Sequence, residues 1–489
     1  MAEIDVRRTF GNGRLSRRQL FMAAGAGFLL SGCSPEGAIN VATPATRNGT
    51  PQVFKVSDLL STSPFHIAHR GSGDNWTEHT ATAYLQAVQS GAKAIEVSVS
   101  STSDGVLVCH HDLNTERMTG RNLPISEVTY AELEACKNNA KSWIGPRAPF
   151  EPIPRLKDVL DAHAANNVIF IEDKQGVNTA QLLDLMDSYP DSKDHFVWKQ
   201  TAAGKHYAEA QERGYKTWGY FVDNVQVPFA EYADRFDYLG IYHGATDDEI
   251  KALVAIGKPV ICWEIHTRWM RERVLALGVQ GLMCSNFPYV SSNKAISSQD
   301  AFASGVRAAG DLPYILAAEY QPTVQPEFSS VSLNHESSSS YTLGSMCPIG
   351  KDSYSLSFDM RWPLDIPGSG SAGMAFGQND DQPYRPTVPA TVGGYHLTVD
   401  RVGVMRLFAR AAGALDGELL RELRTEAPKA GAWMRFRIEI GPADIAVSRT
   451  DGEVVSGAVS NSTYRGGYFG LTKNYKGRQP VEFRQVAVT

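Results

Sequence analysis

Six ionisable side chains in the first half of the chain are of types that could do chemistry together. Each lies in or close behind a short apolar run, and they are His69, Arg70, Glu96, His111, Glu172 and Lys174. Two imidazoles suit proton transfer near neutral pH. An arginine and a lysine suit a phosphate, and two glutamates suit a hard divalent cation. The combination indicates phosphodiester hydrolysis, in which cations hold the phosphate while a histidine pair moves protons.

The apolar runs alternate with helix-like segments, such as Thr80–Ser90, from about residue 65 to residue 289. Eight runs read as buried strands: Phe65–Ala68, Ala94–Val99, Val168–Ile171, Phe196–Trp198, Thr217–Tyr220, Tyr238–Ile241, Val260–Trp263 and Gly281–Cys284. This alternation predicts a parallel sheet, either open or closed as a (β/α)₈ barrel.

A ninth run, Val106–Cys109, follows Asp104-Gly105, and Asp-Gly between two apolar runs is a strong hairpin signal. An antiparallel return through that turn is expected to bring His111 back opposite Glu96. Without the hairpin arm, eight parallel strands remain, which favours the barrel. Catalytic groups of a barrel lie at the C-terminal ends of its strands, so the six side chains and Trp263 would meet at one mouth.

Beyond about Pro313 the pattern changes to a period of two, as in Tyr354–Arg361 and Ala432–Ile440. This alternation predicts an all-β sandwich of the jelly-roll type over residues 313–489, and residues 293–312 are expected to form a last helix and a linker. The second domain looks like the concanavalin-like modules of secreted proteins, which often bind carbohydrate. Its aromatic side chains are interpreted as packing groups rather than as a glycan platform.

The first 33 residues have the features of an export signal. Arg17-Arg18 precedes the uncharged run Leu20–Ser31, whose twelve residues are too few to span a bilayer. The sequence Leu30-Ser31-Gly32-Cys33 resembles the lipobox of bacterial lipoproteins, in which the cysteine becomes the lipidated N-terminus. We therefore expect export by the twin-arginine route. Lipid on Cys33 would hold the protein on the outer face of the cytoplasmic membrane, and residues 34–60 would form a flexible tether.

The composition is that of an ordinary globular protein. Its 489 residues include 47 Lys plus Arg and 53 Asp plus Glu, a net charge of −6. A mildly acidic chain without a basic stripe is a poor candidate for binding nucleic acid. The six cysteines form no CxxC pair, and those other than Cys33 are expected to be small buried hydrophobes: Cys109, Cys136, Cys262, Cys284 and Cys347.

The ordered set of motifs resembles the glycerophosphodiester phosphodiesterases. The motifs are His69-Arg70-Gly71, Glu78 with Thr80, Gly91–Glu96, Ser103–Gly105, His111-Asp112, Ile153–Leu156, Ile171–Lys174 and Trp263. The resemblance covers roughly residues 64–290 and implies a TIM barrel of the phospholipase C-like phosphodiesterase type over residues 61–292. It also implies hydrolysis of glycerophosphodiesters to glycerol 3-phosphate and an alcohol. Because the protein is expected outside the membrane and has a second module, a cell-wall polymer with glycerophosphate links is a further expected substrate.

Site roles follow from the same resemblance. His69 and His111 would act as acid and base, Arg70 and Lys174 would hold the phosphate, and Glu96 and Glu172 would bind Ca²⁺ or Mg²⁺. The family's usual Glu-x-Asp is here Glu96-Val97-Ser98, which removes one anionic ligand. We therefore expect a weakened or absent metal site. Two further departures are His79 for a usual asparagine and Asn286 for a usual aspartate.

Several roles stay open at this point. Glu78 either orients substrate or caps a helix that begins near Thr80, and Trp263 either lines the site or packs in the barrel. His243 and His266 are interpreted as structural histidines. The chain could instead be a pseudoenzyme, a phosphate- or polymer-binding lipoprotein that lost its metal site at Ser98. A third alternative is a phosphodiesterase that acts on membrane head groups.

Overall fold

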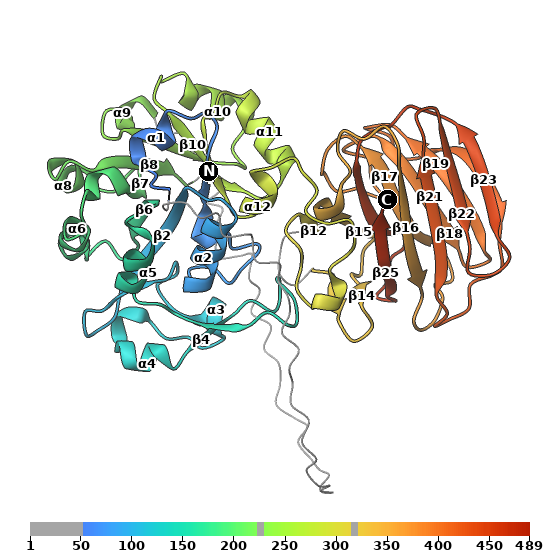
Figure 1. Ribbon diagram of the computed structural model, residues 1–489, viewed down its shortest axis with the longest axis horizontal. Helices are drawn as coiled ribbons and strands as arrows, with labels where there is room; N and C mark the ends of the chain where they lie inside the picture. Colours follow the sequence, from blue (N-terminus) through green and yellow to red (C-terminus); the bar gives the residue numbers. More distant parts are fainter. Residues whose placement is uncertain (1–51, 223–228, 314–320) are drawn as a thin grey trace, which may run out of the picture. The chain divides into compact units, whose positions relative to one another are not determined.

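Eight parallel strands close into a barrel in the first half of the chain, with helices around it (Figure 1). The computed structural model describes residues 52–222, 229–313 and 321–489. The barrel strands are β1 (Phe65–Ala68), β2 (Ala94–Ser101), β6 (Val168–Asp173), β7 (Phe196–Thr201), β8 (Lys216–Phe221), β9 (Tyr238–Tyr242), β10 (Val260–Ile265) and β11 (Gly281–Cys284). Strand β1 pairs with both β11 and β2, which closes the sheet and confirms the barrel.

The barrel helices follow the strands along the chain. They are α2 (Ala81–Gln89), α5 (Leu156–His163), α6 (Thr179–Asp187), α7 (Ser192–His195), α8 (Tyr207–Glu212), α9 (Phe229–Ala233), α10 (Asp247–Val254), α11 (Arg268–Ala276) and α12 (Phe287–Val290). None of the helices within the described ranges has the length and apolar character needed to cross a bilayer.

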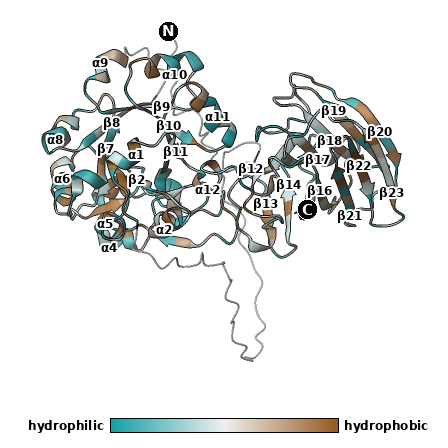
Figure 2. Cartoon of the chain, turned by 45° about the horizontal axis from the view of Figure 1, so that its top comes forward, coloured by the Kyte–Doolittle hydropathy of each residue, from teal (hydrophilic) through white to brown (hydrophobic). Residues whose placement is uncertain are grey.

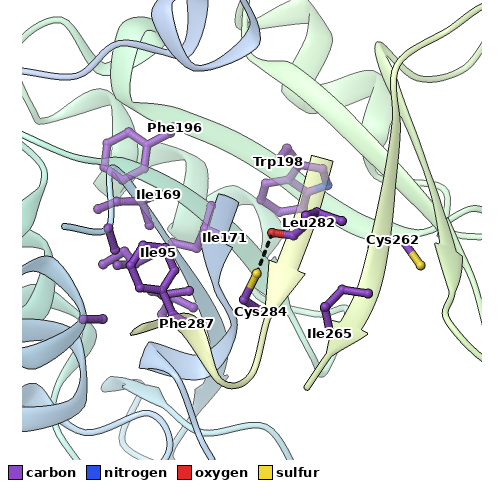
Figure 3. Packing of buried hydrophobic residues seen from close by; sticks show 14 of the residues in the cluster. Ile95, Ile169, Ile171, Phe196, Trp198, Cys262, Ile265, Leu282, Cys284 and Phe287 are labelled. Atoms are coloured by element: carbon purple, nitrogen blue, oxygen red, sulfur yellow. Dashed lines mark hydrogen bonds between the residues drawn. The ribbon is translucent and has the colours of Figure 1, made fainter. Parts of the chain in front are cut away.

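Two apolar clusters separate the two faces of the barrel strands. Ile95, Ile169, Ile171, Phe196 and Trp198 pack in the layer shared with the helices (Figure 3). Residues of the other parity, among them Phe170, Val197 and Trp218, form a second cluster inside the barrel. Because strand side chains alternate, Glu172 shares the inner face with Phe170, and Lys199 shares it with Val197.

The predicted hairpin forms between β2 and β3 (Leu107–Cys109). Val99 pairs with Cys109, and the His110 amide donates to the Ser98 carbonyl at 3.0 Å. This register would place Val97, not Glu96, across from His111, so the expected pairing of His111 with Glu96 is wrong by one residue. The insertion that follows contains α3 (Glu116–Thr119), α4 (Tyr130–Glu134), β4 (Lys137–Asn139) and β5 (Phe150–Pro152).

Two expectations about connecting segments need correction. The tether was expected to run to residue 60, but Val56–Leu60 forms helix α1, and its buried Val56 and Leu59 pack on the cluster inside the barrel. Their spacing of three residues places both on one face of the helix. The helix expected within residues 293–312 does not form; this stretch contains a 3₁₀ turn, Phe302–Ser304, and strand β12 (Asp311–Pro313). Of that turn only Phe302 is buried, too little apolar surface to hold a longer helix.

The second half of the chain is all-β, as predicted, and consists mainly of two antiparallel seven-stranded sheets. One sheet holds β12, β15 (Ser339–Leu343), β24 (Tyr468–Lys473), β17 (Ser371–Gln378), β18 (Gly394–Asp400), β19 (Val404–Arg410) and β20 (Glu418–Arg424). The other holds β13 (Thr323–Gln325), β14 (Ser330–Leu333), β25 (Val481–Val488), β16 (Tyr354–Arg361), β21 (Met434–Ile440), β22 (Asp444–Arg449) and β23 (Val455–Ser460). Both sheets contribute side chains to one core.

The period-two pattern corresponds to burial on one face of each strand. In β21 buried apolar residues alternate with exposed polar ones, and Figure 2 shows both kinds of residue along the strands of this domain. The aromatic residues Trp362, Tyr384, Tyr395 and Tyr475 are buried, which confirms that they are packing groups. The five cysteines within the described ranges are buried and free, also as predicted.

A buried carboxyl at the start of this domain makes folding stability depend on pH. Ser345 Oγ donates to Asp311 Oδ1 at 2.5 Å, and burial raises the pKa of Asp311 from 3.8 to about 7. The folded chain therefore binds this proton more tightly than the unfolded chain, and stability falls as pH rises from about 4 to about 7. Asp311→Asn should raise the free energy of unfolding by about 1–3 kcal/mol at about pH 8 and change it little at about pH 4.

Denaturant unfolding at the two pH values measures this effect. Asp365→Asn is the matched control, because Asp365 is exposed. A stabilisation by Asp311→Asn that is the same at both pH values would contradict the prediction.

Candidate active site

A pocket of about 270 Å³ opens at the C-terminal ends of the barrel strands. Side chains from several elements line it, among them His69, Arg70, Glu78, Glu264, His266 and Arg307. The sequence predicted that six ionisable residues would meet at this mouth, and of these His69 and Arg70 line the pocket. Its volume is near the lower end of the range for small-molecule sites.

His69 is positioned by the turn that follows strand β1. The side chain is almost fully buried, with Nδ1 3.0 Å from Ser285 Oγ and Nε2 3.9 Å from Glu264 Oε1. Burial lowers the pKa of His69 to about 4, although Glu264 acts in the opposite direction. The imidazole is therefore neutral near pH 7 and can accept a proton.

Arg70 lies next to His69, with a positive φ of 52° that turns its backbone sharply. Its Nη1 donates to both carboxylate oxygens of Glu78 at 3.2 and 3.3 Å, and Nη2 lies 3.6 Å from Glu264 Oε1. Its Nε is buried without a hydrogen-bond partner among the described residues. A buried donor without a partner costs free energy, and a phosphate oxygen entering the pocket would remove that cost.

Glu78 holds Arg70 and does not cap the following helix. The side chain of Thr80 accepts the cap hydrogen bond from the Ala83 amide, so the capping role belongs to Thr80. Arg117 from the insertion donates to Glu78 through Nη1 at 3.0 Å and Nη2 at 2.6 Å. Of the two roles left open for Glu78, the structure thus favours a role at the site over helix capping.

His111 lies just beyond the hairpin strand and is half-buried. Its Nδ1 is 2.8 Å from Asp112 Oδ1, and Arg117 Nε donates to Asp112 Oδ2 at 2.6 Å. Burial lowers the pKa of His111, the hydrogen bond to Asp112 raises it, and the nearby charge of Arg70 lowers it further. The neighbouring His110 is instead buried, with Nε2 3.1 Å from the Asn114 carbonyl, which is a structural contact.

Glu96, an expected metal ligand, is fully buried and its oxygens are occupied. Lys199 Nζ donates to Oε1 at 2.7 Å, and Ser98 Oγ donates to the same oxygen at 3.2 Å. The Arg70 amide donates to Oε2 at 3.0 Å. Lys199 and Arg70 thus hold this carboxylate from two sides.

Glu172, the second expected ligand, is held in the same way. Lys199 Nζ donates to its Oε2 at 2.6 Å. The Tyr220 hydroxyl donates to Oε1 at 2.6 Å, and Lys174 Nζ lies 3.4 Å from the same oxygen. The two glutamates therefore share one buried ammonium, that of Lys199.

This donor set does not fit a divalent cation. All four carboxylate oxygens of Glu96 and Glu172 accept hydrogen bonds, and a positive charge lies between the two groups. Within the described ranges, no cluster of three His, Cys, Asp or Glu side chains is arranged to hold a metal ion. The two expected metal ligands, Glu96 and Glu172, are thus bridged by Lys199, and no catalytic step is assigned to a metal.

Residues 69–288 match the glycerophosphoryl diester phosphodiesterase family. We call this part of the chain the phosphodiesterase-like domain. Cys33 and the predicted export signal lie outside the residues that the structure describes.

Curated relatives and solved structures resemble part of the chain. A probable glycerophosphodiester phosphodiesterase 1 of Mycobacterium tuberculosis is 35% identical over 135 residues, which cover 26% of this chain and 48% of that protein. Glycerophosphodiester phosphodiesterase GDPD6 of Arabidopsis thaliana is 46% identical over 61 residues, 12% of this chain and 16% of that protein. The chain thus spans less than half the length of these relatives. The structure of an Oleispira antarctica phosphodiesterase with its product sn-glycerol-3-phosphate aligns at 20% identity and a TM-score of 0.42, covering 47% and 96% of the two chains.

The mouth of the phosphodiesterase-like domain contains two carboxylates, those of Asp74 and Glu264, that were not among the predicted site residues. His266 Nδ1 is 2.7 Å from Asp74 Oδ2, and His266 Nε2 is 3.4 Å from Glu264 Oε2. Although burial lowers it, these two carboxylates raise the pKa of His266 to about 10, so the ring is charged. His266, interpreted from the sequence as a structural histidine, is thus held by two carboxylates, and it also lines the pocket.

Trp263 lies on the inner face of β10, where it packs against the rings of Tyr220 and Tyr242 at centroid distances of 5.6 and 5.0 Å. Its indole N–H is buried without a hydrogen-bond partner among the described residues. Trp263 thus helps to position Tyr220, which in turn holds Glu172.

Proposed function

We propose that the phosphodiesterase-like domain hydrolyses glycerophosphodiesters to glycerol 3-phosphate and an alcohol. The observation that carries the proposal is that a neutral His69 adjoins Arg70 at one pocket, and that Arg70 Nε has no partner among the residues that the structure describes. The family match over residues 69–288 supports the class of substrate.

The proposed reaction needs two proton transfers. Arg70 and Lys174 hold the non-bridging phosphate oxygens and stabilise the charge that develops on them. His69 takes a proton from water as its oxygen attacks phosphorus, and His111 gives a proton to the leaving alcohol oxygen as the phosphorus–oxygen bond breaks. Asp112 holds the ring of His111 in place.

The test is to incubate the full chain with glycerophosphocholine and measure the release of glycerol 3-phosphate. Both site histidines have a lowered pKa. That of His69 is about 4, and that of His111 lies below its ordinary value. The base must be neutral and the acid protonated, so kcat/KM should be highest at a pH below about 6.5, the ordinary pKa of histidine. A pH–rate profile measures this, and an optimum in the alkaline range would contradict it.

The second candidate function is a non-catalytic lipoprotein that binds phosphate groups. It is favoured by the occupied oxygens of Glu96 and Glu172, which already accept hydrogen bonds from Lys199. Binding of glycerol 3-phosphate without turnover of any glycerophosphodiester would support it. Turnover that appears only in Ser98→Asp would support a lost metal site.

We also propose that the chain is exported by the twin-arginine route and anchored by lipid on Cys33. A glycerophosphodiester in a cell-wall polymer is then the natural substrate, and the β-sandwich would bind carbohydrate of that polymer. Cys33→Ser should move the protein from the membrane fraction to the soluble fraction. If the Cys33→Ser chain does not pellet with cell-wall material, the sandwich has a structural role. Hydrolysis of intact phospholipid in vesicles would instead favour a membrane substrate.

A further inference from the structure

We propose that Lys199 takes the place of a divalent cation in this site, so that the chain acts on its phosphodiester without a metal. Turnover without a metal rests on the proposed function, whereas the pairing of Lys199 with the two glutamates does not. Lys199 is a positioning residue, because its ammonium pairs with Glu96 and Glu172 and it is not among the residues that line the pocket.

The position of Lys199 in the barrel brings its ammonium between the two carboxylates. It lies on β7, which pairs with β6, and β6 pairs with β2. Glu172 is on β6 and Glu96 is on β2, and all three side chains are on the inner face of the barrel. The Lys199 side chain is 7% exposed, and its Nζ is 2.7 Å from Glu96 and 2.6 Å from Glu172.

The environment stabilises the ammonium in this place. Its Nζ lies 5.1 Å from the centroid of the Tyr220 ring and 5.8 Å from that of the Trp218 ring, distances at which a cation is attracted to an aromatic ring. Tyr220 also donates to Glu172, so the same side chain holds both partners. A lysine in this setting is paired twice and packed, which is the condition under which a charge is tolerated inside a protein.

Charge counting shows that Lys199 can replace a metal without changing the net charge of the site. Three carboxylates around a divalent cation, the site expected from Glu-x-Asp, carry a net charge of −1. Glu96 and Glu172 around the single ammonium of Lys199 also carry −1, because Ser98 is uncharged. The missing carboxylate at Ser98 and the added ammonium at Lys199 thus compensate each other.

A divalent cation would have to displace the ammonium to reach these oxygens. Two positive groups held within a few ångströms in a buried site repel each other strongly, and expelling Lys199 would leave its charge buried without a partner. We therefore expect the chain to have no useful affinity for Mg²⁺ or Ca²⁺ at this site.

The first experiment measures metal binding without substrate. The melting temperature of the full chain should be the same, to within about 1 °C, in a chelator, in Mg²⁺ and in Ca²⁺. Lys199→Ala uncovers the two carboxylates, so its melting temperature should be lower in chelator and should rise by several degrees on addition of either metal. Lys216→Ala is the matched control, because it removes an exposed lysine from the adjacent strand β8 and should not create a metal response.

The second experiment measures turnover. Hydrolysis of glycerophosphocholine by the wild-type chain should change by less than about twofold between chelator and millimolar metal, whereas Lys199→Ala should require added metal for activity. Should Lys199→Ala fail to fold, Lys199→Gln keeps the hydrogen-bond donors without the charge and must show the same new metal response.

The outcomes separate this inference from the proposed function. Stabilisation of the wild-type chain by micromolar Mg²⁺ or Ca²⁺, loss of more than about tenfold of its activity in chelator, or the lack of a metal response in both Lys199 variants would overturn the role of Lys199. An absence of turnover under every condition would overturn the proposed function alone, since the melting experiment needs no substrate.

Discussion

His69→Ala should reduce kcat/KM for glycerophosphocholine by about 10²–10⁴-fold, the usual effect of removing a positioned general base. His69 is a neutral imidazole at the pocket, and Ser285 and Glu264 hold it from two sides. The variant keeps both charged partners of Arg70, so the phosphate should still bind and KM should change much less than kcat. Steady-state kinetics measure the changes in kcat and KM separately.

His206→Ala is the control for this prediction. His206 is a surface histidine paired with Glu209 and should give wild-type rates. Equal turnover of His69→Ala and the wild type would contradict the proposed mechanism. The same experiment on His111→Ala tests the proton donor.

Arg70→Ala should reduce kcat/KM by about 10²–10³-fold, because it removes the donors that face the developing charge on phosphate. The Arg70 side chain is 15% exposed, and its Nε is buried without a partner in the described part of the chain, so a phosphate oxygen could complete its hydrogen bonding. Glu78 would retain Arg117 as a partner, so the fold should survive. Kinetics together with a melting curve separate a loss of catalysis from a loss of folding stability.

Two further variants sharpen the test of Arg70. Arg70→Lys keeps the charge but loses the planar fork, so its activity should fall between those of the wild type and Arg70→Ala. Arg213→Ala removes a surface arginine paired with Asp184 and should leave the kinetics unchanged. A KM and kcat of Arg70→Ala within about twofold of wild type would show that Arg70 does not contact the substrate.

Strand ends explain why the sequence analysis found some site residues and missed others. His69, Glu96, Glu172 and Lys174 stand in motifs that could be recognised, and the structure brings the last three close to Lys199 or to one another. Lys199 lies on β7, which continues beyond the apolar run Phe196–Trp198.

Glu264 was missed for the same reason, because β10 continues beyond Trp263. An apolar run stops at the first polar residue, whereas a parallel strand continues through it to the mouth of the barrel, where polar residues belong. Continuing the period-two alternation from Val197 would have placed Lys199 on the inner face.

The sequence by itself determined the alternation of strands and helices, the change to period two near residue 313, and the set of histidines and cations, because these depend on local patterns. Only the tertiary structure decided that β1 pairs with β2 to close the barrel, that Lys199 lies between Glu96 and Glu172, and that His266 is paired with Asp74. The physical reason is that these contacts join residues that are far apart in the chain. Charge pairing across a barrel depends on strand order and register, which no local pattern of side chains specifies.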